Sequence, residues 1–455
     1  MMTFDRVLPE LLAACESDPV FMNGASTTQL VERACAVRDP QGRVRVVLAP
    51  SRALSDPDIG SLKQRLEAAL STRLETFFVP PVLTMRDPEA AGKIAAALLE
   101  RAEDWRDAVY EDPVRGGLVM PPPGRWKLLE RRLTKQGWLD AKEAEEPWPL
   151  SAGRPVVTFY SFKGGVGRTT ALVSCALQLA EQGRRVAIVD LDLEAPGLGP
   201  LLGVDTDRGV LDAIVDHIAT GRLSLEGLHA SPQVLGAAAA SMIDVFPAGR
   251  LDHNFLEKLS RLDFSVVGPW GGTEGIPVHQ ALRALLAAIR KNLMPDYILV
   301  DARAGLHDLA GLSLHGLAHV DVLVTRASEQ AYRGLDLTVR AIARRKPEKK
   351  LRCVTVHGFA TSDPSSREGK AELDEVRERA YSIFSEHLYD DAPAETDRQA
   401  AHFPWPLRRN SLLERFSSIT SALDELRTDQ YRELLDRIIE LCAPEDPSNE
   451  DEGAT

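Results

Sequence analysis

The stretch that most constrains the fold of this chain is TFYSFKGGVGRTTAL, which spans residues 158–172. An apolar run of strand character leads into three glycines and then into a segment of helical character that opens near Arg168. Glycine tolerates positive φ, so the backbone amides of such a turn can point inward at a phosphate. The N-terminus of the following helix adds the positive end of its dipole. A chance glycine turn of this pattern has odds on the order of 10⁻³, so the stretch predicts a phosphate-binding loop.

The residue types in this loop indicate which groups contact the ligand. We expect the amides of residues 164–167 to face the phosphates and the Thr169 hydroxyl to reach Mg²⁺. Arg168 stands where such loops most often carry lysine. Arginine keeps the charge but is bulkier and hydrogen-bonds as a planar fork. We expect Arg168 to face the β- and γ-phosphates, with binding preserved and the rate of hydrolysis most affected by the exchange.

Acidic residues follow two of the apolar runs in the same half of the chain. VAIVDLDLEAPGL places Asp190 and Asp192 at the end of one run, and DYILVDARAG places Asp301 at the end of another. Continuous apolar runs are typical of parallel strands buried on both faces, and ligands bind at the carboxyl edge of such sheets. Each acid taken alone fits an ordinary strand end or helix cap equally well. Together with the glycine loop, they favour a Mg²⁺-nucleotide site.

KGGVGRTT, DLDLEAPG and DYILVDARAG, in this order, resemble the deviant Walker A P-loop ATPases of the ParA/MinD (SIMIBI) family. The resemblance covers residues 154–335 well, extends toward 442 and does not reach the N-terminal third. It implies a mostly parallel, doubly wound α/β sheet and dimerisation around two ATP molecules. Members of that family partition DNA, position division sites or sort cargo. The KGGVGR wording further resembles a branch found near mobile-element or anti-phage genes.

The family pattern implies a role for each matching residue. Lys163 matches the signature lysine that reaches the phosphates of the partner subunit, and Asp192 matches the acid that positions the attacking water. Gly305 matches the glycine whose amide senses the γ-phosphate, and His357 stands where a base-recognition asparagine is usual. The implied site residues are Asp192, Lys163 and Arg168 for catalysis, Lys163, Gly164, Gly165, Val166, Gly167, Arg168, Thr169 and Thr170 for nucleotide binding, and Thr169, Asp190 and Asp301 for the metal.

The chain is too long for one ordinary core. The predicted organisation is a small α/β domain of unknown role at 1–102, a proline-rich connector with a basic amphipathic helix at 103–153, the ATPase domain at 154–442 and a disordered acidic tail at 443–455. The predicted helix lies in RWKLLERRLTKQGWL, at 125–139. Its basic face could touch anionic lipid or nucleic acid, but packing of its Trp/Leu face against the ATPase domain is the favoured interpretation.

Composition limits the partners, membrane segments and metal sites that we expect. The net charge of −13 disfavours a protein that coats nucleic acid, so nucleic acid is an allowed but not a favoured partner. No apolar run approaches the roughly 20 residues of a membrane span. The five cysteines are scattered and form no Cys-x-x-Cys pair, which argues against a disulfide framework and a zinc site. We expect a cytoplasmic protein.

These observations support one principal hypothesis and two alternatives. The principal hypothesis is a Mg²⁺-dependent switch that binds ATP, hydrolyses it slowly, forms an ATP-dependent homodimer and regulates an unidentified protein partner or cargo. The first alternative is a nucleotide-sensing scaffold without turnover. The second is a partition-type protein that binds DNA through basic patches.

Overall fold

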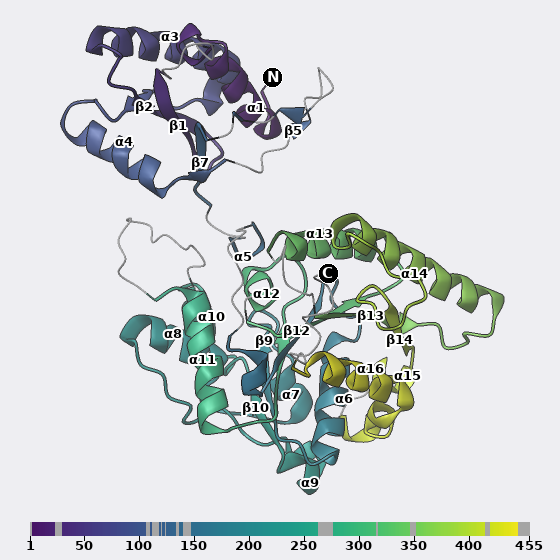
Figure 1. The fold of residues 1–455 in the computed structure, drawn as a ribbon. Coiled ribbons are helices and arrows are strands. Elements are labelled where there is room, and N and C mark those ends of the chain that lie inside the picture. Colours follow the sequence, from purple (N-terminus) through teal and green to yellow (C-terminus); the bar gives the residue numbers. More distant parts are fainter. Residues whose placement is uncertain are drawn as a thin grey trace, which may run out of the picture. The chain divides into compact units, whose positions relative to one another are not determined.

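The fold is described from a computed structural model, which divides the chain into two compact units, Met1–Leu133 and Thr134–Thr455 (Figure 1). Each unit is described by itself. The described residues are 2–22, 30–105, 110–111, 118–119, 121–122, 124–132, 136–139, 147–262, 276–314, 317–345, 352–414 and 419–444. Residues 445–455, most of the predicted acidic tail, lie outside them. No helix in these ranges is both long and apolar enough to cross a bilayer.

The N-terminal unit is a mixed sheet between two helical layers, with strand order β3-β2-β1-β7-β4. Alternate side chains of β1 and β2 enter two separate cores, one under α1 and α3 and the other under α4. The strands are β1 Val31–Arg38, β2 Val44–Pro50, β3 Leu83–Thr84, β4 Glu103–Asp104 and β7 Trp126–Glu130, with β5 Tyr110–Glu111 and β6 Leu118–Val119 as a separate pair. The helices are α1 Phe4–Glu16, α2 Pro19–Met22, α3 Asp56–Leu74, η1 Glu75–Phe77 and α4 Glu89–Arg101.

The predicted basic helix over 125–139 is wrong. Its first part is β7, which pairs in parallel with β1, and among the described residues of this range only Gln136–Leu139 (α5) is helical. Trp126 and Leu129 are spaced like one face of a helix, but they lie on opposite faces of a strand. Trp126 enters the core under α1 and α3, whereas Leu129 packs on the core under α4. A central strand between two helical layers needs apolar groups on both faces, and this requirement decides the conformation.

The C-terminal unit contains a seven-stranded, all-parallel sheet in the order β10-β9-β11-β8-β12-β13-β14, which confirms the predicted fold class. Every residue of β8, β9 and β12 is buried, as expected from their continuous apolar runs. Two prolines lie in β14, where an edge position tolerates the missing donors. The strands are β8 Val156–Ser161, β9 Val186–Leu191, β10 Ile243–Phe246, β11 Tyr297–Ala302, β12 Val320–Thr325, β13 Cys353–Ala360 and β14 Pro404–Arg408.

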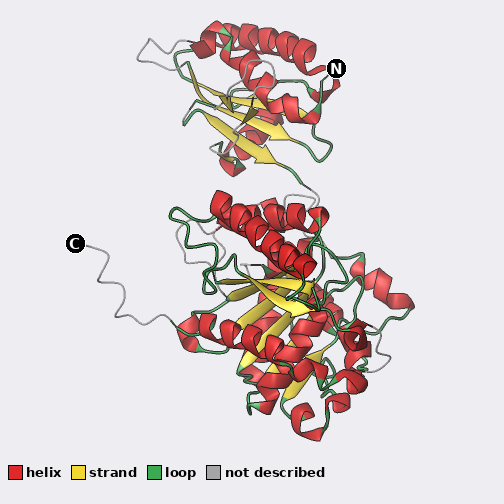
Figure 2. Cartoon of the chain, turned by 90° about the vertical axis from the view of Figure 1, so that its right-hand side faces the viewer, coloured by secondary structure: helices red, strands yellow, loops and turns green. Residues whose placement is uncertain are grey.

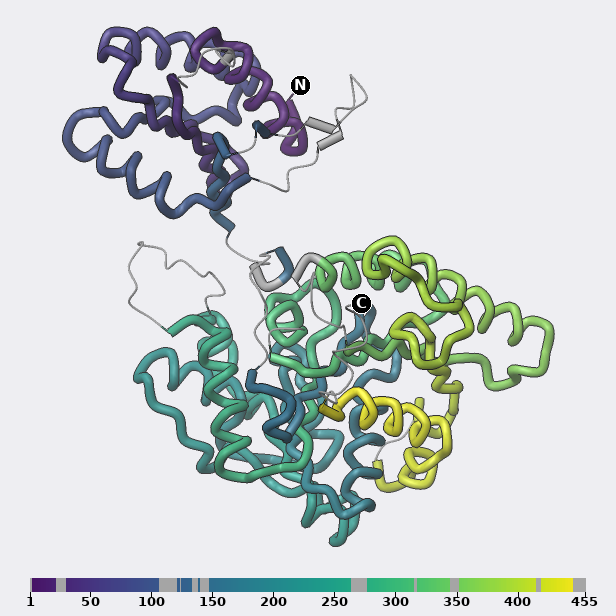
Figure 3. Tube along the Cα trace, viewed as in Figure 1, coloured from purple at the N-terminus to yellow at the C-terminus, as the bar shows by residue number. Residues whose placement is uncertain are grey.

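Helices cover both faces of this sheet (Figure 2). One face packs on α6 and α16, and the other packs on α8, α10 and α11 beside β9 and β11 and on α13 and α14 beside β12 and β13. Figure 3 shows α16, near the C-terminus, lying beside α6. The helices are α6 Arg168–Glu181, α7 Leu198–Leu202, α8 Val210–Thr220, α9 Ala237–Ala240, α10 His253–Leu259, α11 Val278–Asn292, α12 Asp308–Ser313, α13 Glu329–Arg345, α14 Arg367–His387, α15 Ser411–Glu414 and α16 Asp429–Leu441, with short 3-10 turns η2 Leu150–Ala152, η3 Gln233–Leu235, η4 Ile419–Ala422 and η5 Glu425–Arg427.

Candidate functional site

The strand order brings three separate sequence motifs to one edge of the sheet. β11 lies between β9 and β8, and all three run in parallel, so their carboxyl ends meet. The register places Asp301 of β11 directly opposite Asp190 of β9 on one side and Phe159 of β8 on the other. The glycine loop leaves β8 just beyond this point. The predicted loop and the predicted acids therefore form one site.

The glycine loop connects Ser161, the last residue of β8, to Arg168, the first residue of α6. Gly165 and Gly167 have φ of 67° and 88°, which other residues adopt only at a cost. A Cβ added at Gly164, Gly165 or Gly167 would meet nothing within 4 Å, so the loop bounds an open space. This space and the helix that starts behind it fit a phosphate group.

Two glycines on neighbouring elements support the loop from behind. A Cβ at Gly358 of β13 would lie 2.0 Å from the backbone oxygen of Val166, and a Cβ at Gly334 of α13 would lie 2.0 Å from the Phe162 ring. Both distances are far below van der Waals contact. The loop therefore packs directly against β13 through the Val166 backbone and against α13 through the Phe162 side chain, and this packing holds its shape.

The Arg168 side chain points toward the acids. Its Nε donates to Oδ1 of Asp301 at 2.6 Å, and its Nη2 donates to Oδ2 of Asp192 at 3.1 Å. The Arg168 residue is only 9% exposed. The neighbouring Thr169 hydroxyl donates to Oδ2 of Asp301 at 2.7 Å. The structure thus unites four predicted site residues in one hydrogen-bonded cluster, and it places the guanidinium on the carboxylates.

Asp190 is the most deeply buried member of the acidic group, with no exposed surface. Its two oxygens accept the amides of Asp192 at 3.0 Å and Leu198 at 3.1 Å. Burial, followed by the charge of Asp301, raises the pKa of Asp190 to about 8. Burial also raises the pKa of Asp301, although the Arg168 charge opposes the shift. A raised pKa means that the surroundings disfavour the ionised carboxylate, so a cation beside Asp190 and Asp301 would favour their charged forms.

The donor set of this cluster fits Mg²⁺. Thr169 offers a hydroxyl, and Asp190 and Asp301 offer carboxylates, which are the hard oxygen ligands that this ion prefers. Asp192 lies beside them through its contact with Arg168. The residues present therefore suit a magnesium-nucleotide complex held between the loop and the acids.

The remaining predicted residues lie around this cluster. Lys163 and Thr170 are half-buried, Val166 is buried, and the described residues offer Lys163 no ion pair within 4.0 Å. The Gly305 amide donates to the Ser161 carbonyl at 3.0 Å. His357 is 1% exposed, and its ring nitrogens lack hydrogen-bond partners among the described residues, although Nε2 lies 3.4 Å from Oε1 of Glu372. His357 is thus buried in the unit.

Three residues that carried no predicted role complete the edge. Arg303 follows Asp301 by two positions, and its Nη1 lies 2.8 Å from Oε2 of Glu194 and 3.9 Å from Oδ1 of Asp192. The other oxygen of Glu194 lies 2.7 Å from Nε2 of His307. Arg303 and Glu194 each lie two residues from a predicted site acid, Asp301 and Asp192 respectively. This proximity in sequence is the signal that could have identified them. Their contact with each other depends on the strand order.

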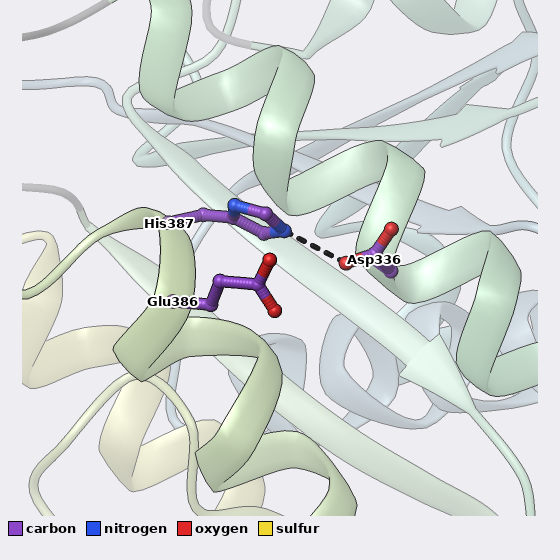
Figure 4. A group of neighbouring side chains, drawn as sticks. All are labelled: Asp336, Glu386 and His387. Atoms are coloured by element: carbon purple, nitrogen blue, oxygen red, sulfur yellow. Dashed lines mark hydrogen bonds and ion pairs between the residues drawn. The ribbon is translucent and has the colours of Figure 1, made fainter. Parts of the chain in front are cut away.

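A second group of potential metal ligands lies on α13 and α14 (Figure 4). Ligand atoms of Asp336, Glu386 and His387 lie within 4.8 Å of one another. His387 Nε2 lies 2.7 Å from Asp336 Oδ1, and Arg340 also faces Asp336 at 3.8 Å. This arrangement is sufficient as a bridge between two helices, so we do not assign it a ligand.

Comparison with known proteins gives a family match at the same segment. Residues 154–220 match the model of the ParA family described as NUBPL iron-transfer P-loop NTPase. An uncharacterised protein of Mycobacterium tuberculosis H37Rv is 26% identical over 303 residues, which are 64% of this chain and 82% of that protein. The septum site-determining protein MinD of Helicobacter pylori is 30% identical over 37% of this chain and 50% of its own length. The iron-sulfur cluster carrier protein of Escherichia coli K12 is 26% identical over 40% of each chain.

Solved structures of low sequence identity align with about two thirds of the chain. A plasmid partition protein of Borrelia burgdorferi bound to AMPPNP is 16% identical, with a TM-score of 0.41, and the alignment covers 64% of this chain and 98% of that one. MinD of Pyrococcus horikoshii complexed with Mg-ADP is 19% identical, with a TM-score of 0.39 and coverage of 64% and 94%.

Proposed function

Because its C-terminal unit is a ParA/MinD-like P-loop domain, we propose that this protein is a Mg²⁺-dependent ATP-binding switch that hydrolyses ATP slowly. We further propose that it dimerises when ATP is bound and acts on a protein partner. The observation that carries this proposal is the cluster of Arg168, Thr169, Asp192 and Asp301 directly behind the glycine loop. Loop and acids meet at the carboxyl edge of a parallel sheet, which is where such folds bind ligands.

Each residue of the cluster has a task in this proposal. The loop amides and Lys163 hold the phosphates, and Arg168 supplies a charge-assisted donor once it exchanges a carboxylate for phosphate. Thr169, Asp190 and Asp301 would hold Mg²⁺, which would neutralise phosphate charge. Asp192 orients the attacking water through a carboxylate oxygen. In this structure Asp192 is kept in place by Arg168 and by the amide of Ala195, which lies 3.3 Å from Oδ1.

Phosphate release with Mg²⁺ and ATP tests the proposal directly. The wild type is compared with Asp192→Asn, which keeps the shape of the side chain and removes its charge, and with Asp207→Asn as a matched control whose side chain is 96% exposed. We expect slow turnover that requires Mg²⁺, a loss of at least tenfold in Asp192→Asn and no change in the control. Tight nucleotide binding by a wild type without turnover would instead establish the nucleotide-sensing scaffold.

A specific observation keeps the scaffold as the second candidate. Arg168 binds the two acids that hydrolysis needs, and a guanidinium that stayed there would allow binding without turnover. Iron-sulfur carriage, the activity named for one relative, gains no support from the cysteines. Clusters are held by exposed or clustered thiolates, whereas all five cysteines here are buried, and the ligand group found among the described residues contains none of them.

A further inference from the structure

We propose that Arg303 is a catalytic residue of this site, a built-in arginine that contacts the γ-phosphoryl group as it is transferred to water. The inference rests on the proposed function, because it requires ATP hydrolysis at the glycine loop. It adds a residue that carried no predicted role, and it places in the same subunit a charge that some P-loop enzymes receive from another protein.

The first support is the position of the guanidinium relative to Asp192. Nη1 of Arg303 lies 3.9 Å from Oδ1 of Asp192, and Nη2 of Arg168 lies 3.1 Å from Oδ2 of the same carboxylate. Asp192 therefore lies between two guanidinium groups. If Asp192 orients the attacking water, a cation on its other side lies next to the point where water and the γ-phosphorus meet.

The second support is an incomplete set of hydrogen bonds. Nη1 of Arg303 is buried, and none of its N–H groups meets an acceptor with hydrogen-bond geometry among the described residues. Its 2.8 Å approach to Glu194 is thus an ion pair without an aligned hydrogen bond. The side chain as a whole is 27% exposed, so a ligand can reach it. A guanidinium has five donors, and a buried donor that is not aligned with an acceptor loses hydrogen-bond free energy that a well-placed anion would restore.

The third support is the way Glu194 is held. Its Oε1 lies 2.7 Å from Nε2 of His307, whose Nδ1 accepts the Leu309 amide at 3.2 Å, so Nε2 carries the proton and donates. The His307 carbonyl accepts Nε1–H of Trp138 at 2.7 Å. Glu194 is thereby fixed to the loop after β11, and it keeps Arg303 beside Asp192. We assign Glu194 as a positioning residue for Arg303.

The chemistry needs no proton from Arg303. The water oxygen forms a bond to the γ-phosphorus while the bond from that phosphorus to the β–γ bridging oxygen breaks, and this electron pair leaves with ADP. The proton released from water ends on phosphate or solvent. Negative charge increases on the bridging and γ-oxygens as this happens, and Arg303 donates hydrogen bonds to it.

The test compares the wild type with Arg303→Ala, Arg303→Lys and Glu194→Gln, with Arg250→Ala as a control whose side chain is 63% exposed and lies in the same unit. Three quantities are measured for each: the Kd for ATP with Mg²⁺, the single-turnover rate of phosphate release, and trapping of ADP with Mg²⁺ and fluoroaluminate. Melting temperatures verify that each variant is folded.

We expect Arg303→Ala to keep its Kd within about threefold while the rate falls at least about 100-fold and fluoroaluminate trapping is lost. Arg303→Lys should recover only part of the rate, because an ammonium lacks the planar fork. The single-turnover rate of Glu194→Gln should fall about tenfold. An Arg303→Ala rate within threefold of an active wild type would overturn this inference alone. A wild type without turnover would overturn the proposed hydrolysis and this inference together. If Arg303→Ala does not fold, a Glu194→Gln variant with wild-type rate and trapping overturns the inference.

Discussion

Nε of Arg168 donates to Oδ1 of Asp301 at 2.6 Å, while the Thr169 hydroxyl donates to the other oxygen of the same carboxylate at 2.7 Å. Both carboxylate oxygens of Asp301, which is predicted to bind Mg²⁺, thus accept hydrogen bonds from the first two residues of α6. A nucleotide-magnesium complex must compete with these contacts. These contacts predict how substitutions at the site behave.

Removing the Arg168 charge should destabilise the ligand-free protein. Asp301 is 2% exposed and would lose its ion-pair partner, which typically costs 3–5 kcal/mol in a buried pair. We expect Arg168→Ala to lower the melting temperature and a second substitution, Asp301→Asn, to restore most of the loss. Arg208→Ala is the control, because Arg208 pairs with Asp216 at the surface. If the losses in melting temperature caused by the two substitutions simply add in the double variant, the prediction is contradicted.

Arg168 should also contribute to nucleotide binding. We expect Arg168→Ala to weaken ATP binding about tenfold or more, equivalent to about 1.4 kcal/mol, a modest share of one charge-assisted phosphate contact. Arg168→Lys should preserve binding and leave turnover equal or faster, since a compact ammonium fits this loop. Isothermal titration of the three proteins with ATP and Mg²⁺ measures this. Three equal dissociation constants would show that Arg168 does not contact the phosphates.

The glycine behind the loop should be intolerant of a side chain. A Cβ at Gly358 would lie 2.0 Å from the Val166 carbonyl oxygen, so Gly358→Ala must displace the loop backbone. We expect about 1–3 kcal/mol lower stability and weaker ATP binding. Gly60→Ala is the matched control, because Gly60 lies in α3 with nothing within 4 Å and alanine favours helix by about 1 kcal/mol. Calorimetry and ATP titration compare the two variants. Equal stability and equal ATP affinity in Gly358→Ala and Gly60→Ala would refute the packing argument.

His357 should make the folded state sensitive to acid. Burial, followed by the Arg326 charge, lowers its pKa to about 4 from the usual 6.5. Below pH 6.5 the unfolded chain binds a proton that the folded chain accepts only near pH 4, so the free energy of unfolding falls through this window by up to about 3 kcal/mol. We expect urea titrations to show a flatter pH dependence for His357→Asn. The exposed residue His253, changed to Asn, is the control. Identical slopes in wild type and His357→Asn would contradict this assignment.

All five thiols should be unreactive in the native protein. Each cysteine is buried, and burial raises the pKa of Cys175 and Cys442 to about 12. Because the thiolate is the reactive form, we expect no alkylation by iodoacetamide at pH 8 within an hour and complete alkylation of the five after denaturation. Mass spectrometry counts the modified sites. Rapid labelling of any cysteine without denaturant would show that its core opens.

The sequence by itself determined the local parts of the site. Glycine at 165 and 167 supplies the two positive φ angles of the loop, and the buried runs that end near Asp190 and Asp301 are parallel strands. These properties depend on neighbours along the chain, so they are visible in the sequence. The segment at 126–130 shows where prediction from the sequence fails. Its apolar spacing suits a helix as well as a strand, and pairing with β1 makes it a strand.

The tertiary structure alone decided which groups meet. The order β9-β11-β8 places Asp190 opposite Asp301, and only that order brings Arg303 to Glu194 and Asp192. Arg168 was expected to face phosphate, and its position on the carboxylates follows from burial, because a guanidinium enclosed with acids pairs with the nearest charge. Strand order and side-chain pairing result from contacts between residues far apart in sequence, and those contacts leave no periodic pattern along the chain.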